Sequence, residues 1–498
     1  MIDLTFYKEY RQKLLALQYV DFITSWDMQT EAPKDSAPMQ AEVQGVLAEM
    51  QYKLTTDPVW QAEVERLYKA RRSLDAVTRH EIVELKKTID NTLKIPMEEY
   101  VEIQRITAEG YPVYVQAKQT GDFNLFKPYL AKIIEFSQKQ TKWLQTEDKK
   151  GYDVLLDMYE PDYKQADYDA FFDVLREKLV PFVKKIASLP QLEDYSFAKL
   201  EYPIEKQKEF CEYLRDVMCF DKNKGLMKES EHPFTSGWCN NDVRITNHYY
   251  LDNFVSSIFS CIHETGHATY EAQVDDSLQG TFMSGGASLG LHESQSRFYE
   301  NVIGRSYAFW KKHYSKLKKT FPKQLRNVSL DTFYKYINTV ECSFIRVEAD
   351  ELTYPLHIML RYQIEKEIIS GQLLVDDIPS RWNQLVEEYF GLKVPSDSLG
   401  CLQDVHWAYG NFGYFPTYAL GSAIASQLYH HMSKSFNVEK SLKKGNTEKI
   451  NKWLKKKIHQ YGSSKYPKQI IKIATKGQFD PNYYVDYLIE KYSKIYNV

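Results

Sequence analysis

A short segment, residues 261–267 (CIHETGH), constrains the fold of this chain more than any other feature of the sequence. His263 and His267 stand four positions apart within a helical-looking run, residues 254–273. Residues at i and i+4 project from the same face of a helix, so both imidazoles can reach one tetrahedral Zn²⁺ while Glu264 points beside the metal. The segment therefore predicts a helix that carries part of a metal centre.

The carboxylate of Glu264 gives this centre a chemical use. Beside the cation it can accept a proton from a bound water, whose pKa the cation lowers toward ~7, and so deliver hydroxide to a peptide carbonyl. This is metallopeptidase chemistry. The alternative is an amphipathic helix with two surface histidines, because short patterns recur by chance. Gly266, between the histidines, weakens the helix and removes bulk beside the metal.

A catalytic zinc site needs a third protein ligand from another element. Glu293 is the preferred candidate, because it follows a glycine-bearing loop, residues 283–288 (MSGGAS), that permits a sharp reversal of the chain. The adjacent His292 could compete, but neighbouring helical residues diverge by ~100°, so only one of the two can face the metal. Two other carboxylates nearby are expected to lie at the surface or to support the ligands: Glu271 and Glu300.

Helical periodicity predicts a mainly α-helical body. Apolar residues recur at helical spacing from Tyr7 and again from Phe126. Gly, Pro and Asp interrupt the pattern at residues 32–35, 121–122 and 149–161, which we expect to be loops between helices. The alternation in residues 242–246 (DVRIT) instead favours a strand of a small sheet. We find no internal repeat and no low-complexity tether, so one continuous body is expected for residues 1–498.

Composition and charge exclude several classes of protein. The chain has 64 Lys+Arg against 67 Asp+Glu and a formal charge of -3, so it lacks the basic field that nucleic-acid binding usually needs. It has no stretch of ~18 apolar residues that could span a membrane, and residues 1–15 lack the apolar core of a signal peptide. The six cysteines form no CxxC pair, which suits a reducing compartment. We expect a cytoplasmic protein that binds neither nucleic acid nor membranes.

Several separated motifs recur in the order of one known family. They are His232-Pro233-Phe234 and residues 242–246, 263–267, 292–294, 345–350 (IRVEAD) and 400–407 (GCLQDVHW). Residues 26–30 and 152–161 match as well, so the likeness spans roughly residues 15–430. The chain resembles the thermostable carboxypeptidase family of HExxH metallopeptidases, the carboxypeptidase Taq type, and departs from it at no metal or base position.

The resemblance implies both architecture and activity. It implies a helical homodimer in which two lobes of a single domain flank a deep substrate groove, with a small antiparallel sheet near the active site. It implies a zinc-dependent metallocarboxypeptidase that releases single residues from peptide C-termini with broad specificity. His263, His267 and Glu293 would hold one Zn²⁺ per chain and Glu264 would activate water. Co²⁺ or Mn²⁺ could replace zinc in this ligand set.

An enzyme that removes only the last residue must recognise a free carboxylate, which a guanidinium does with paired hydrogen bonds. Arg346, in the motif that lines the groove of the family, is the first candidate, and Arg244 is the second. The alternative for each is a salt bridge to a neighbouring acid, Asp350 or Asp242.

The oxyanion formed during hydrolysis needs donors besides the metal. His406 and a downstream tyrosine could supply them, and the likeness to the His plus Tyr pairs of the thimet oligopeptidase type favours Tyr418 over Tyr414. The alternative for each tyrosine is packing in the core. Three further residues are expected to line or support the groove: Gln403, Asp404 and His232, the last of which could instead cap the turn before Pro233.

Two other functions stay open at this point. The first is an oligopeptidase or dipeptidase that uses the same metal site without a carboxylate anchor at the right distance. The second is a catalytically idle helical scaffold that binds peptides or partner proteins.

Overall fold

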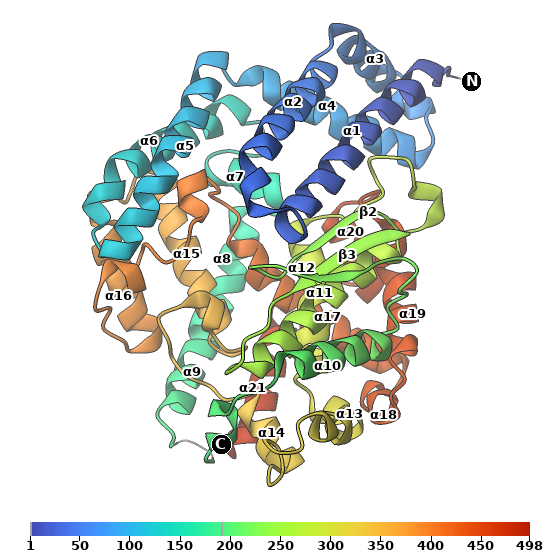
Figure 1. Cartoon of the computed structure of the whole chain (residues 1–498). Coiled ribbons are helices and arrows are strands. Elements are labelled where there is room, and N and C mark those ends of the chain that lie inside the picture. The colour runs from blue at the N-terminus through green and yellow to red at the C-terminus, as the bar shows by residue number, and fades with distance from the viewer. Residues whose placement is uncertain (1, 191–192) are drawn as a thin grey trace.

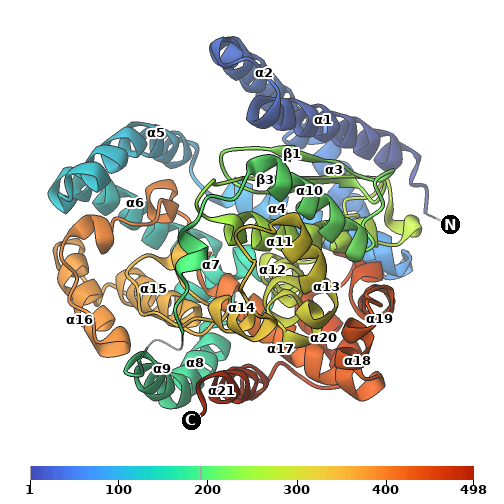
Figure 2. The same cartoon turned by 60° about the horizontal axis from the view of Figure 1, so that its bottom comes forward.

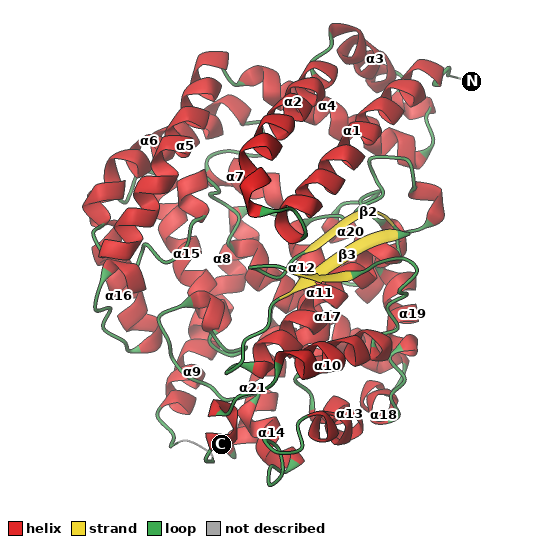
Figure 3. Cartoon of the chain, viewed as in Figure 1, coloured by secondary structure: helices red, strands yellow, loops and turns green. Residues whose placement is uncertain are grey.

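The structure, a computed structural model, describes residues 2–190 and 193–498 and is mainly helical with one small sheet (Figures 1 and 3). The helices up to the sheet are α1 Thr5–Thr30, α2 Ala37–Thr55, α3 Pro58–Lys69, α4 Ala76–Lys94, α5 Met97–Thr120, α6 Phe123–Leu144, α7 Tyr152–Tyr159, α8 Gln165–Val174, α9 Val180–Ala187 and α10 Ile204–Val217. Those after it are α11 Phe254–Ala272, α12 Leu289–Arg297, α13 Tyr307–Thr320, α14 Leu330–Tyr336, α15 Tyr354–Ile369, α16 Ile378–Phe390, α17 Pro416–Ser435, α18 Val438–Lys443, α19 Glu448–Lys457, α20 Pro467–Thr475 and α21 Asn482–Tyr496. The predicted helical fold class is confirmed. None of the described helices is both long and apolar enough to cross a bilayer.

The sheet has three strands, β1 Met227–Glu229, β2 Thr235–Cys239 and β3 Asp242–Asn247, in the order β1-β3-β2. The predicted strand is confirmed as β3, whose Val243 and Ile245 are fully buried and pack near Ala268 of α11. The expectation of an antiparallel sheet is wrong, because the sheet is mixed. β2 and β3 form an antiparallel hairpin, whereas residues 230–234 reverse the chain between the two edges, so that β1 runs parallel to β3.

One predicted loop is also wrong. Residues 149–161 contain α7, whose Leu155 and Leu156 are buried in the largest core cluster. Gly151 immediately precedes the helix in a positive-φ conformation, and Pro161 follows its C-cap, so both residues bound the helix instead of interrupting it. At the end of α5, by contrast, Gly121 forms the left-handed C-cap that the loop prediction requires.

The helix with the HExxH segment lies near the centre of the molecule (Figures 1 and 2). α11 contacts β2 and β3 on one side and α12 on another, and α12 in turn packs against α17. α1 contacts β2 and α2, and the two helices are the dark blue pair in the upper half of Figure 1. α17 contributes buried apolar residues to both large core clusters. The candidate site is therefore built on rigid elements. The organisation as one domain of two lobes stays a prediction.

Gly266 is required by helix packing. A Cβ at this position would lie 2.9 Å from the carbonyl oxygen of Gln295 and 2.9 Å from Cα of Ser296, both on α12. On the other side of α12, a Cβ on Gly421 of α17 would lie 2.8 Å from Cβ and Cγ of Glu293. These approaches involve backbone or the base of a side chain, so little can give way. The glycine between the histidines therefore lets α12 come close enough to present Glu293.

Substituting Gly266 by Ala is expected to lower the free energy of unfolding by about 1–3 kcal/mol, the usual cost of overpacking a well-packed core. Gly45, on α2, is a matched control because no atom lies within 4 Å of its added Cβ. Gly45→Ala should leave stability unchanged or raise it by up to ~1 kcal/mol through helix propensity. Urea unfolding followed by circular dichroism measures both, and equal effects in the two variants would contradict the packing explanation.

Candidate active site

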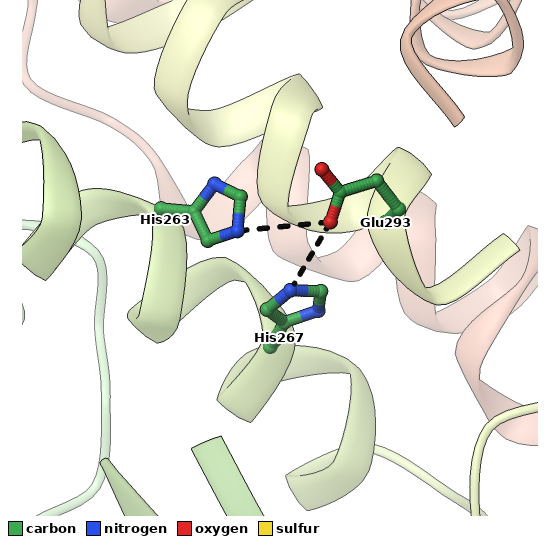
Figure 4. A group of neighbouring side chains, drawn as sticks. All are labelled: His263, His267 and Glu293. Atoms are coloured by element: carbon green, nitrogen blue, oxygen red, sulfur yellow. Dashed lines mark ion pairs between the residues drawn. The ribbon is translucent and has the colours of Figure 1, made fainter. Parts of the chain in front are cut away.

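Three side chains from two adjacent helices converge on one point (Figure 4). His263 and His267 come from α11 and Glu293 from α12, and their candidate ligand atoms lie within 4.8 Å of one another. Nε2 of His263 is 3.7 Å and Nε2 of His267 is 3.4 Å from Oε2 of Glu293. Within residues 2–190 and 193–498, this is the one group of three or more His, Cys, Asp or Glu side chains whose ligand atoms lie close enough together to hold a metal ion.

The chemistry of these residues fits a catalytic divalent cation. Two imidazoles and one carboxylate are a common ligand set of catalytic zinc, which leaves a fourth position for water or substrate. Nδ1 of each histidine is hydrogen-bonded to a neighbouring side chain, so Nε2 remains for the metal. Burial lowers the pKa of His267 to about 3, which keeps this imidazole in the neutral form that binds a metal.

Arg297 and Glu300 support the candidate ligands from the segment that follows Glu293. Nδ1 of His263 lies 2.8 Å from Oε2 of Glu300, which stands on a π-helical turn, Phe298–Gly304. Arg297 donates from Nε to Oε1 of Glu293 at 2.6 Å and from Nη1 to Oε2 of Glu300 at 3.1 Å. Oε1 of Glu293 is thus engaged and Oε2 faces the histidines. The sequence reasoning missed Arg297, although its i+4 spacing from Glu293 was a usable signal.

Glu264 lies beside this group and is 7% exposed. Burial raises the pKa of its carboxyl. Its Oε2 accepts a hydrogen bond of 2.6 Å from Oγ1 of Thr235, the first residue of β2. The small sheet therefore orients the candidate base. Thr235 directly follows the 232–234 motif, but nothing in that spacing showed that its hydroxyl reaches α11.

Arg346 is buried and paired, but not with the acid that the sequence suggested. It donates from Nη2 to Oδ1 of Asp404 at 2.7 Å and from Nη1 to the hydroxyl of Tyr354 at 3.2 Å. Gln403 accepts a hydrogen bond from the backbone N–H of Arg346 at 3.0 Å. The suggested partner, Asp350, instead accepts the N–H groups of residues 352 and 353 at the start of α15. The alternative of a salt bridge to Asp350 is therefore wrong.

A second arginine shares the same carboxylate. Arg361, on α15 and fully buried, donates from Nε to Oδ2 of Asp404 at 2.7 Å and places Nη2 2.5 Å from that oxygen. The two guanidinium groups hold the pKa of Asp404 well below its usual range. Two cations on one anion leave a net positive charge in a buried place, which favours a further anion. No local pattern in the sequence indicated Arg361.

The other two candidates at the sheet lie in different surroundings. Arg244, on β3, donates to both carboxylate oxygens of Asp242 at 2.8 Å. This is the salt bridge that the sequence offered as the alternative to an anchoring role. Its guanidinium also lies over the rings of Phe22 and Trp26 of α1. His232 is exposed in the connection between β1 and β2, where its carbonyl accepts a hydrogen bond of 2.7 Å from the hydroxyl of Ser230.

His406 and the two tyrosines lie next to Arg346. Nε2 of His406 is 3.5 Å from the hydroxyl of Tyr418 on α17, and the ring of Tyr414 is 5.2 Å from that of His406. The guanidinium of Arg346 stands 5.1 Å from the centroid of the Tyr418 ring. Burial raises the pKa of Tyr418, and the negative charge of Glu293 raises this pKa further. The phenol therefore keeps its proton. The structure thus brings the candidate donors, the arginine and the ligand group into one region.

Comparisons with known proteins give the family. A family model described as "Carboxypeptidase Taq (M32) metallopeptidase" matches residues 6–492. Carboxypeptidase 1 of Bacillus subtilis is 41% identical over 473 residues, 95% of this chain and 94% of that protein. Thermostable carboxypeptidase 1 of Pyrococcus furiosus is 35% identical over 490 residues, 97% of this chain and 96% of that protein.

Solved structures agree with this assignment. A carboxypeptidase structure from Pyrococcus furiosus superposes with a TM-score of 0.93 at 34% identity, over 97% of this chain and 98% of that chain. One from Deinococcus radiodurans has a TM-score of 0.94 at 30% identity, over 99% of both chains. The resemblance read from the motifs is confirmed, and the chain belongs to the carboxypeptidase Taq family of metallocarboxypeptidases.

Proposed function

We propose that this chain is a zinc-dependent carboxypeptidase that releases single amino acids from the free C-termini of peptides. The observation that carries the proposal is the pair of groups described above. A buried cluster, Arg346–Asp404–Arg361, has one more positive charge than negative. Tyr354 connects it to the ligand set, because Arg346 donates to the hydroxyl of Tyr354 and Arg297, which donates to Glu293, lies over its ring. A terminal carboxylate placed at Arg346 would balance the charge of the cluster, and the last peptide bond would then lie at the ligand set.

The hydrolytic step follows from the positions of the side chains. A Zn²⁺ held by His263, His267 and Glu293 would lower the pKa of water and polarise the scissile carbonyl. Glu264 takes a proton from the attacking water and then passes it to the leaving amine. The hydroxyl of Thr235 holds this carboxylate in place.

Donors near the anchor complete the proposed site. His406 and Tyr418 would hydrogen-bond the oxyanion as charge develops on it, with Tyr414 as the other candidate phenol. Asp404 and Gln403 orient Arg346 through its side chain and its backbone. Co²⁺ or Mn²⁺ would fit the same ligands. Broad specificity and a homodimer are proposed on the likeness to the family alone.

A peptide ladder tests the function. A mixed-sequence peptide of about ten residues, incubated with the protein and followed by mass spectrometry, should shorten one residue at a time from its C-terminus. A C-amidated copy should be cut far more slowly, because the neutral amide has one acceptor oxygen and cannot form the two-bond ion pair with Arg346 that a carboxylate forms. A chelator should stop both reactions. Internal cleavage would point instead to an oligopeptidase, and an intact peptide with added Zn²⁺ or Co²⁺ would favour the scaffold.

A further inference from the structure

The two candidate ligand histidines are supported in different ways. Nδ1 of His263 faces a carboxylate directly, that of Glu300 at 2.8 Å. Nδ1 of His267 instead faces Nδ1 of a second histidine, His292, at 2.5 Å. Nε2 of His292 in turn lies 2.7 Å from Oε1 of Glu271. We infer that His292 and Glu271 are positioning residues that fix the orientation and proton position of His267 for the metal.

The proton positions follow from the short contact between the two rings. Only one proton can lie between the two Nδ1 atoms. Nε2 of His267 must carry no proton if it binds a cation, so a neutral His267 keeps its proton on Nδ1 and donates it to His292. His292 then accepts through Nδ1 and carries its own proton on Nε2, which it donates to Glu271. The hydrogen bonds thus all point in one direction, from His267 through His292 to the carboxylate of Glu271.

The far end of this chain is held by the loop before α12. Oε1 of Glu271 also accepts a hydrogen bond of 3.0 Å from the backbone N–H of Gly286. A Cβ on Gly286 would lie 2.5 Å from Cδ2 of His292, so the glycine lets the loop close over the imidazole. The ring of Tyr270 lies 5.2 Å from that of His292, and its hydroxyl accepts the N–H of Ala287 at 3.1 Å. His292 therefore has little freedom to turn.

His292 connects the two helices by hydrogen bonds, which it could not do if its ring nitrogens bound the metal. It stands next to Glu293 on α12, and its ring points to α11, where it bonds both His267 and Glu271. Glu271 is i+4 from His267, so one helix supplies both ends of the chain of hydrogen bonds and α12 supplies the middle. Outer partners of this kind typically contribute 10- to 100-fold to metal affinity, since they orient the ligand and raise its basicity.

Three variants test the two hydrogen bonds that connect His267 to His292 and His292 to Glu271. His292→Leu removes the acceptor of His267 and is expected to weaken Zn²⁺ binding 10- to 100-fold. His292→Asn keeps an oxygen near the position of Nδ1 but cannot reach Glu271, so it should recover part of the loss. Glu271→Gln removes the charge at the end of the chain and should weaken binding by a smaller factor than His292→Leu. His430→Leu, at an exposed position of α17, is the matched control and should bind as the unmodified protein does.

The measurement is a Zn²⁺ titration of the metal-free protein against a chromophoric chelator, with circular dichroism and thermal unfolding as checks of the fold. A purely structural role for His292 would lower stability without changing affinity, and Asn would then restore nothing. Affinity within threefold of the unmodified protein in both His292→Leu and Glu271→Gln would overturn the inference. If His292→Leu fails to fold, Glu271→Gln and His292→Asn decide the matter.

The inference rests on the proposed metal site, and the two can fail separately. An unmodified protein that binds no Zn²⁺ stoichiometrically would refute the proposed function. Tight Zn²⁺ binding by the unmodified protein together with equally tight binding by the variants would refute only the positioning role of His292 and Glu271.

Discussion

Replacing Glu264 by Gln is expected to lower kcat by about 10²–10⁴-fold, the usual contribution of a general base. The amide cannot accept the proton of the attacking water or return it to the leaving amine. Its oxygen can still accept the hydrogen bond from Thr235, so the contact between α11 and the sheet is kept. Glu264 is not one of the three converging candidate ligands, and metal content should therefore stay near one ion per chain.

The comparison needs turnover and metal content from the same preparation. Initial rates of single-residue release give kcat, and elemental analysis gives the metal. Glu49→Gln is the matched control, because this exposed glutamate on α2 pairs only with the neighbouring Lys53 in the described structure, and its kcat should not change. A Glu264→Gln protein that keeps more than a tenth of the original kcat, or that has lost its metal, would contradict the assigned role.

Replacing Arg346 by Ala is expected to abolish most of the preference for free over amidated C-termini. For a peptide with a free C-terminus kcat/KM should fall about 30- to 5,000-fold, which corresponds to the ~2–5 kcal/mol cost of removing one partner of a buried, charged hydrogen-bonded pair. The amidated peptide should lose much less. Asp404 keeps Arg361 as its partner, so the substitution leaves no unpaired buried charge that would unfold the protein.

Arg244→Ala distinguishes the two candidate anchors. Arg244 also forms a two-bond pair with one carboxylate, that of Asp242, so the same kind of contact is lost in both variants. The ratio of kcat/KM values for free and amidated peptides should be unchanged in Arg244→Ala. A loss of preference in this variant, with Arg346→Ala unaffected, would reverse the assignment. An unchanged ratio in both active variants would exclude either arginine as the anchor.

Local spacing made the ligand group predictable from the sequence. The separation of His263 and His267 fixes their common face on a helix, and the glycine-bearing loop before Glu293 allows the second helix to return. The divergence of adjacent helical side chains predicts that Glu293 and His292 face different ways, and Glu293 is the one that lies with the two histidines. In the structure its ring hydrogen-bonds His267 and Glu271 instead.

The supporting residues were not predictable in the same way, because they depend on how distant segments pack. The carboxylate of Asp404 lies between two guanidinium groups that come from a 3₁₀ turn beginning at Arg346 and from the middle of α15. Thr235 reaches Glu264 only because the sheet lies against α11. The parallel pairing of β1 likewise follows from the path of its connection, which the alternation of residues along a strand does not encode.

The proposed hydrolytic residues and the proposed anchor come from different stretches of the chain. Residues 235–300 supply the candidate ligands, the candidate base and their supports, whereas residues 346–418 supply the arginine pair, Asp404 and the candidate oxyanion donors. A change confined to the second stretch would therefore alter how the free C-terminus and the oxyanion are held, while the group that would bind the metal is left as it is.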